Sequence, residues 1–182
     1  GLTILVGKPK IGKSVFSLGL ALGLARGGQV LGKEVEGQEV AYLALENTNG
    51  EVQERLDAML QGLPLPQGLY LGYSGWARKG AELEELEDWL EHKPAIRLVI
   101  IDTLAQFCGW QQGNYQTDYK EMSKLKALAD RRQIALFALH HPRKTGGKDL
   151  LDIVSGSTGL TAAADTILIL DRQRFQEKGT LL

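Results

Sequence analysis

Cysteine and long apolar runs are scarce in this 182-residue sequence, and each scarcity excludes a class of protein. The single cysteine, Cys108, has no internal disulfide partner, and no zinc-ligand spacing is present, which favours a reducing, cytoplasmic setting. No apolar run approaches the roughly 18 residues of a membrane helix, and the run Leu2 to Val6 is too short for a signal peptide. We therefore expect a soluble chain with no membrane partner, in which Cys108 is a buried structural thiol.

Neither sign of charge is in clear excess, because the sequence has 21 Lys and Arg and 22 Asp and Glu residues. This balance does not draw the whole chain towards nucleic acid or an acidic membrane, so such contacts have to be local. A hydrophobic content of 43% is enough for one sizeable core. Both ends lie beside strand-like runs without polar flanks, and we expect a single domain over residues 1–182 that is truncated at both ends.

Short apolar runs that do not alternate with polar residues predict strands covered on both faces. These runs are Leu2 to Val6, Val40 to Leu45, Leu98 to Ile101, Ile134 to Leu139 and Thr166 to Leu170, with a weaker one at Leu69 to Tyr73. Amphipathic stretches lie between them. We expect their apolar stripes in the core: Val52, Leu56, Met59 and Leu60; Leu83, Leu86, Trp89 and Leu90; and Tyr119, Met122, Leu125 and Leu128. The alternation predicts an α/β fold, a mostly parallel sheet flanked by helices, with ligands at the carboxyl ends of the strands.

A glycine-rich loop follows the first predicted strand. Its sequence is Gly7-Lys8-Pro9-Lys10-Ile11-Gly12-Lys13-Ser14, and Val15 continues into a helix-favouring stretch. The loop fits the phosphate-loop pattern G-x-x-x-x-G-K-[ST] between a strand and a helix. In such a loop backbone N–H groups surround the phosphates, Lys13 reaches the β- and γ-phosphates, and Ser14 is a ligand of Mg²⁺. We expect residues 7 to 15 to bind ATP with magnesium.

Carboxylates end two of the other predicted strands. Asp102 follows Leu98 to Ile101, in the place of a Walker B aspartate that holds magnesium through water. Glu46 follows Val40 to Leu45, where a carboxylate polarises the water that attacks the γ-phosphate. An aspartate that caps a turn and a solvated glutamate at a strand end are the structural alternatives.

A histidine pair, His140 and His141, ends the run Ile134 to Leu139. Adjacent side chains of an extended chain point apart and no third ligand lies nearby, so the pair predicts a γ-phosphate sensor rather than a zinc site. We expect His140 to line the nucleotide site as well, although one ring of such a pair is commonly buried. The Gly- and Lys-rich stretch Arg143 to Gly156 predicts a loop facing a ligand or a partner.

Several separated motifs resemble the RecA-like ATPases of the RepA helicase branch. They are GKPKIGKS, YLALE, LVIIDTLAQF, ALHHPRK and SGSTGLTAAADTILIL, and they extend over nearly the whole chain. The resemblance implies a RecA-like P-loop NTPase core, with Glu46 as the catalytic glutamate, Asp102 as the Walker B residue and His141 as the γ-phosphate sensor. It also places Ser157 in the turn that follows the sensor loop.

Members of this branch typically form rings, often hexamers, with nucleotide between subunits and DNA in the central channel. The resemblance therefore implies self-association and single-stranded DNA as a partner. The loops Cys108 to Gln116 and Arg143 to Gly156 would line the channel. Cations and aromatic rings in them can contact phosphates and unpaired bases: Trp110, Tyr115, Arg143, Lys144 and Lys148.

One position departs from that branch. An arginine finger tends to precede the last strand there, whereas this chain has Asp165, so the candidate fingers are Arg172 and Arg174 past the strand. The leading hypothesis is an ATP-driven DNA helicase or remodelling motor. The alternative is a nucleotide-gated regulatory or assembly ATPase with slow hydrolysis, while a small-molecule kinase is disfavoured because Arg143 to Lys148 makes a poor lid.

Overall fold

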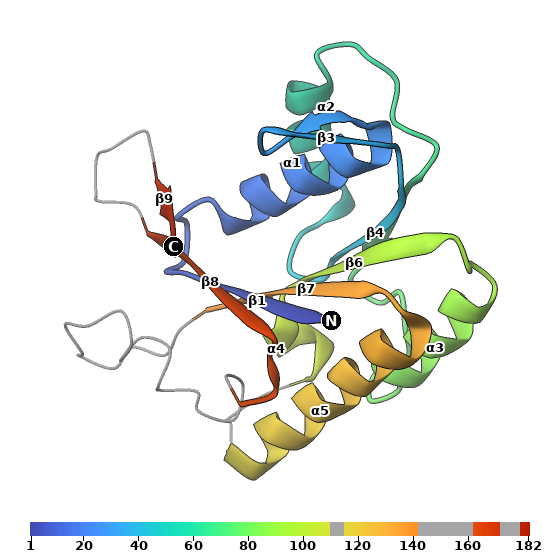
Figure 1. Ribbon diagram of the computed structural model, residues 1–182, viewed down its shortest axis with the longest axis vertical. Coiled ribbons are helices and arrows are strands. Elements are labelled where there is room, and N and C mark those ends of the chain that lie inside the picture. Colours follow the sequence, from blue (N-terminus) through green and yellow to red (C-terminus); the bar gives the residue numbers. More distant parts are fainter. Residues whose placement is uncertain (110–114, 142–161, 172–178) are drawn as a thin grey trace.

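A seven-stranded sheet forms the centre of the computed structural model, which describes residues 1–109, 115–141, 162–171 and 179–182 (Figure 1). The strands are β1 (Leu2–Val6), β4 (Glu39–Ala44), β5 (Leu69–Tyr73), β6 (Ile96–Asp102), β7 (Ala135–His140), β8 (Thr166–Asp171) and β9 (Thr180–Leu181). Their order is β5-β4-β6-β7-β1-β8-β9, and neighbouring strands are parallel except β8 and β9. All six strands expected from the apolar runs are confirmed, with small shifts at their ends.

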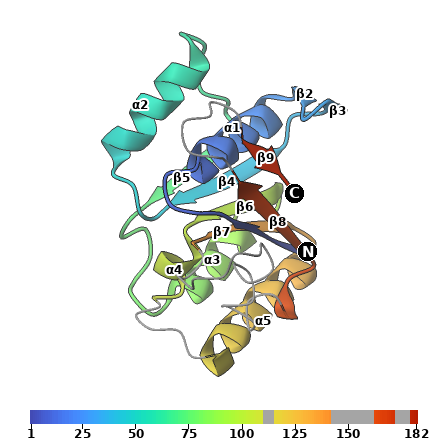
Figure 2. The ribbon, with the colours of Figure 1, turned by 90° about the vertical axis from the view of Figure 1, so that its left-hand side faces the viewer.

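Helices cover both faces of this sheet. They are α1 (Lys13–Arg26), α2 (Asn49–Leu60), α3 (Glu82–Glu91), α4 (Leu104–Phe107) and α5 (Tyr115–Arg132). The helices α1 and α2 lie on one face, and α3, α4 and α5 lie on the other (Figures 1 and 2). This arrangement confirms the predicted α/β class, and it explains the non-alternating runs because the strands are buried on both sides.

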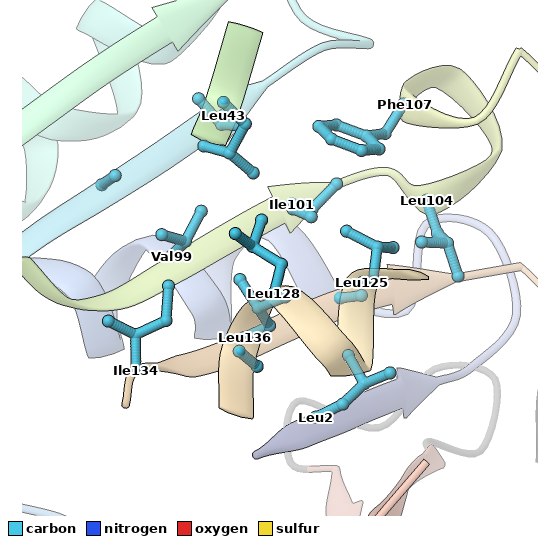
Figure 3. Packing of buried hydrophobic residues seen from close by; sticks show 14 of the residues in the cluster. Leu2, Leu43, Val99, Ile101, Leu104, Phe107, Leu125, Leu128, Ile134 and Leu136 are labelled. Atoms are coloured by element: carbon cyan, nitrogen blue, oxygen red, sulfur yellow. The ribbon is translucent and has the colours of Figure 1, made fainter. Parts of the chain in front are cut away.

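Each face has its own hydrophobic cluster. On one side, residues of α1 and α2 pack on alternate residues of β1, β4, β6 and β7. On the other, Leu125 and Leu128 of α5 pack with Leu2 of β1 and Leu136 of β7 (Figure 3). The predicted stripes of α2 and α3 are confirmed, but the prediction for Tyr119 is wrong because its side chain is 45% exposed. Tyr119 lies nearer the start of α5 than Met122, the first residue of that stripe to be fully buried.

The hairpin formed by β2 (Gly28–Val30) and β3 (Lys33–Val35) was not expected from the sequence. Leu31 and Gly32 form its two-residue turn with φ angles of 49° and 75°, which is the conformation of a type I′ turn. The hairpin packs on α1, since a Cβ added at Gly23 would lie 3.1 Å from Val30 Cγ2. Its strands are too short to show a run of apolar residues.

Candidate functional site

The candidate site lies where four parallel strands end. The central strands β4, β6, β7 and β1 are consecutive neighbours, so the residues after them meet at one edge of the sheet. Glu46, Asp102 and His141 lie at the ends of β4, β6 and β7, and the loop Gly7 to Ser14 follows β1. Parallel pairing therefore brings together residues that are far apart in the sequence.

Two glycines fix the path of the phosphate loop. A Cβ at Gly7 would lie 2.8 Å from the carbonyl oxygen of Leu170 in β8, so only glycine fits beneath that strand end. Gly12 has a φ of 112°, which other residues rarely adopt, and it caps the N-terminus of α1. No acidic side chain lies in the first turn of α1, so its positive end is available to an anion.

Lys13 is the best-buried charged group of the loop, with 4% of its surface exposed. Its ammonium donates to the carbonyl oxygens of Gly7 at 2.6 Å and Lys8 at 3.0 Å, and to His141 Nδ1 at 2.9 Å. An ammonium group has three hydrogens, so a phosphate oxygen has to replace at least one of these acceptors. Burial lowers the pKa of Lys13 to about 8, although Asp102 and Glu46 act in the opposite direction.

Glu46 contacts two neighbouring elements. His141 Nε2 lies 3.6 Å from Glu46 Oε2, and Thr103 Oγ1 donates to Glu46 Oε1 at 2.6 Å. The contact with His141, and after it the hydrogen bond from Thr103, lower the pKa of Glu46 despite partial burial, so this carboxyl group is ionised at neutral pH. It can accept a hydrogen bond from an attacking water molecule.

His141 connects the lysine to the glutamate. Its Nδ1 accepts from the Lys13 ammonium, so the proton of the neutral ring is on Nε2, which faces Glu46. A chain of polar contacts thus passes from Lys13 through His141 and Glu46 to Thr103. A capping box at Thr48 and Glu51 begins α2 and fixes the segment that carries Glu46.

Asp102 is almost fully buried, with 1% of its surface exposed, and its Oδ2 accepts from the Tyr42 hydroxyl at 2.7 Å. Ser14 and Asp102 offer hard oxygen atoms, the ligand type of Mg²⁺. Within the described ranges no three His, Cys, Asp or Glu side chains converge as a metal site. This donor set fits Mg²⁺, which is usually held by one or two protein groups together with phosphate oxygens and water.

Comparison with known families agrees with this geometry. Residues 1–147 match the family described as AAA domain. The chain belongs to this family. The match confirms the predicted assignment to the RecA-like P-loop ATPases and supports nucleotide binding and ATPase activity in general. Among curated proteins, none matches the sequence.

Not every predicted residue of this AAA domain joins the group around Lys13. His140 is buried, and it belongs to the row of β7 that contains Leu136 and Ala138, on the face covered by α3 and α5. The helix α1 packs on the other face of the sheet, so a role of His140 in nucleotide binding stays a prediction, whereas His141 contacts Lys13. Elsewhere in the loop Ile11 is buried, and Val15 is 51% exposed at the start of α1. Three further residues of the loop are exposed: Lys8, Pro9 and Lys10.

Several predictions fall outside the described residues and stay predictions: those for Trp110, Arg143, Lys144, Lys148, Ser157, Arg172 and Arg174. Tyr115 is the first residue of α5, but its side chain is not among those described. Cys108 is half-buried against the cluster on the α5 side, in partial agreement with its expected structural role. In the described parts, none of the helices combines the length and apolar character that a bilayer crossing needs.

Asp165 has a structural position in this AAA domain. It precedes β8, which is parallel to β1, and so it lies at the sheet edge opposite the phosphate loop. Its carboxylate accepts from the Leu2 backbone N–H at 2.7 Å and from Lys126 Nζ at 2.9 Å. These contacts join β8 to β1 and α5, and they account for an acidic residue at this position.

We expect Asp165→Asn to lower the melting temperature slightly at neutral pH and to leave nucleotide affinity unchanged. The hydrogen bonds from Lys126 and Leu2 lower the pKa of Asp165 in the folded chain below 3.8. Its contribution to stability is therefore present above pH 3.8 and is lost as the pH falls through the folded pKa. Thermal melts of both proteins at several pH values should converge in acid. A difference in melting temperature that does not depend on pH would contradict this assignment.

Two residues of the site, Tyr42 and Thr103, were not predicted from the sequence. Each had a signal: Tyr42 is a hydroxyl-bearing residue inside an apolar strand, and Thr103 directly follows Asp102, the predicted Walker B aspartate. Both are 1% exposed, and each donates to one of the two carboxylates, Asp102 and Glu46. They form the layer that holds the carboxylates in place.

Proposed function

We propose that this AAA domain binds ATP with Mg²⁺ on the loop Gly7 to Ser14 and hydrolyses it, and that the full-length protein is a ring-forming DNA helicase or DNA-remodelling motor. The observation that carries the hydrolytic part is the polar chain from Lys13 through His141 to Glu46. Lys13 and Glu46 contact the two nitrogens of one imidazole, which supports one site with a charge for the phosphates and a carboxylate for the water. A protein that only binds nucleotide has no need of a carboxylate in that position.

Each residue of the site has its own role in binding or hydrolysis. The ammonium group of Lys13 gives up one of its acceptors, a carbonyl oxygen or His141, and donates to oxygens of the β- and γ-phosphates instead. It stabilises the negative charge that develops on them. Glu46, held by Thr103, orients the attacking water and accepts its hydrogen bond. Ser14 and Asp102 would hold Mg²⁺, which neutralises phosphate charge when bound. When Lys13 moves to the phosphates, His141 Nδ1 loses its donor, so His141 can report the presence of the γ-phosphate to Glu46.

The motor part rests on the likeness to the RepA branch. The ring would place nucleotide between subunits, with Arg172 or Arg174 of a neighbour as the finger. The loops Cys108 to Gln116 and Arg143 to Gly156 would contact single-stranded DNA. Hydrolysis at the subunit boundary would move these loops, because the second follows β7, the strand that ends next to His141.

The decisive experiment is ATP hydrolysis by the full-length protein with and without single-stranded DNA, together with sedimentation. The proposal predicts faster hydrolysis with DNA and a ring-sized species with nucleotide. Slow hydrolysis at the same rate with and without DNA, together with no ring-sized species in sedimentation, would overturn the motor proposal. Slow hydrolysis with nucleotide-dependent assembly would instead support a regulatory or assembly ATPase.

Affinity for ATP should fall above the pKa of Lys13. The lysine must be charged to bind phosphates, and burial lowers its pKa to about 8. We expect the dissociation constant of ATP to rise up to about tenfold per pH unit above that pKa. Titrations between about pH 7 and 9 test this, with Lys13→Met as the control that should lose the dependence. A flat profile in the wild-type protein would show that Lys13 keeps its proton throughout.

Thr103→Val should slow hydrolysis roughly tenfold, the effect expected for one hydrogen bond to a charged group. Valine has nearly the same shape and removes only the donor to Glu46 Oε1. ATP affinity should stay unchanged, because the hydroxyl of Thr103 donates to the glutamate. The measurement is kcat together with the ATP dissociation constant. Equal kcat in both proteins would show that Glu46 is oriented without Thr103.

A further inference from the structure

The hydroxyl of Tyr42 lies between the two residues that would hold magnesium. Its oxygen is 2.7 Å from Asp102 Oδ2 and 3.4 Å from the carbonyl oxygen of Ser14. Tyr42 comes from the middle of β4, Asp102 from the end of β6 and Ser14 from the first turn of α1. One side chain therefore connects the sheet, the Walker B carboxylate and the phosphate loop.

Both partners of the short hydrogen bond are buried, with 1% of each residue exposed. The Tyr42 ring packs in the cluster beneath α1 and α2, and a packed aromatic ring has little freedom to move. A tyrosine hydroxyl has one hydrogen, and Asp102 Oδ2 is the nearer of its two acceptors. The carboxylate thus has a donor held in place on one of its oxygens.

We propose that Tyr42 is a positioning residue for magnesium: its hydroxyl holds the Asp102 carboxylate in the orientation that receives the hydrated metal, in register with Ser14. The inference rests on the proposed function, since it concerns the same nucleotide site. Groups that orient a metal ligand from behind commonly change metal affinity by 10- to 100-fold when removed, roughly the effect expected here.

The test is a magnesium titration of nucleotide binding. A fluorescent ATP analogue is bound to wild-type protein and to Tyr42→Phe, and the Mg²⁺ concentration that gives half of the tightening is measured. Phenylalanine keeps the ring and removes only the hydroxyl. We expect that concentration to rise roughly tenfold or more in the variant, while affinity in EDTA stays the same.

Tyr70→Phe is the matched control. The Tyr70 hydroxyl also donates to a carboxylate, Glu39 Oε2 at 3.1 Å, but Glu39 starts β4, at the sheet edge away from the phosphate loop. Its magnesium dependence should equal that of the wild type. A double-mutant cycle with Asp102→Asn adds the second control, because a residue that acts through Asp102 has no further effect once the carboxylate is gone.

The outcomes separate this inference from the proposed function. An unchanged magnesium dependence in Tyr42→Phe, or an equal effect of that change on the Asp102→Asn background, would overturn the positioning role. A Tyr42→Phe chain that does not fold at the assay temperature would overturn it as well, since the hydroxyl would then serve the core. A wild-type protein that does not bind the analogue with Mg²⁺ would overturn the proposed function itself.

Discussion

Glu46→Gln is expected to lower ATP hydrolysis by roughly 10²- to 10⁴-fold, the range for loss of a general base, while ATP still binds. Glutamine keeps the size of the side chain and one oxygen to accept from Thr103, but it removes the negative charge that orients and deprotonates water. The low pKa of Glu46 means that the wild-type carboxylate carries this charge at neutral pH.

The measurement is phosphate release together with the dissociation constant of ATP for each protein. Glu54→Gln is the control, because it is the same substitution at an exposed position of α2, away from the site. It should behave as the wild type. Phosphate release by Glu46→Gln at a rate close to that of the wild type would show that another group activates the water.

Lys13→Met should weaken ATP binding on the order of 100-fold or more, as expected when one partner of a buried charge pair is removed. Methionine retains an apolar stem of similar length, so the loss concerns the ammonium group and its contacts with phosphate. In the free protein the same group contacts Gly7, Lys8 and His141.

Melting temperatures separate lost binding from lost folding in that variant. The matched control is Lys33→Met on the exposed edge of the β2 and β3 hairpin, which should keep wild-type affinity. ATP binding by Lys13→Met that equals the wild type would contradict the assignment of the loop as the phosphate site.

The sheet could be predicted from the sequence because its strands are buried on both faces. That burial removes polar residues from the runs, so Leu2 to Val6 or Leu98 to Ile101 stand out without any alternation. The β2 and β3 hairpin could not be predicted, since three-residue strands with mostly exposed or half-exposed side chains carry no such pattern. The prediction that Tyr119 is buried was wrong for another reason. Helical periodicity predicts which face of α5 is buried, but not where along the helix the core begins.

For the site, the sequence was enough to predict which strand end carries each residue. Parallel pairing brings Glu46, Asp102 and His141 to the edge of the phosphate loop whatever the details of packing. Their partners were not predictable, because the contact between Lys13 and His141 joins residues 128 positions apart and depends on side-chain direction. The direction of each histidine follows from the register of β7, which separates His141 from the buried His140. The finger candidates Arg172 and Arg174 lie outside the described residues and stay predictions, whereas Asp165 accepts from the Leu2 backbone N–H and has a structural position.

The central claim is that the loop Gly7 to Ser14 and Glu46 together form a hydrolytic ATP site. The most direct test is a single-turnover experiment, with wild-type protein in excess over ATP labelled in the γ-phosphate. The account predicts that free phosphate appears with Mg²⁺ and that the bound ATP stays intact with EDTA or in Glu46→Gln. ATP that binds to the wild-type protein with Mg²⁺ but is never cleaved would contradict the claim.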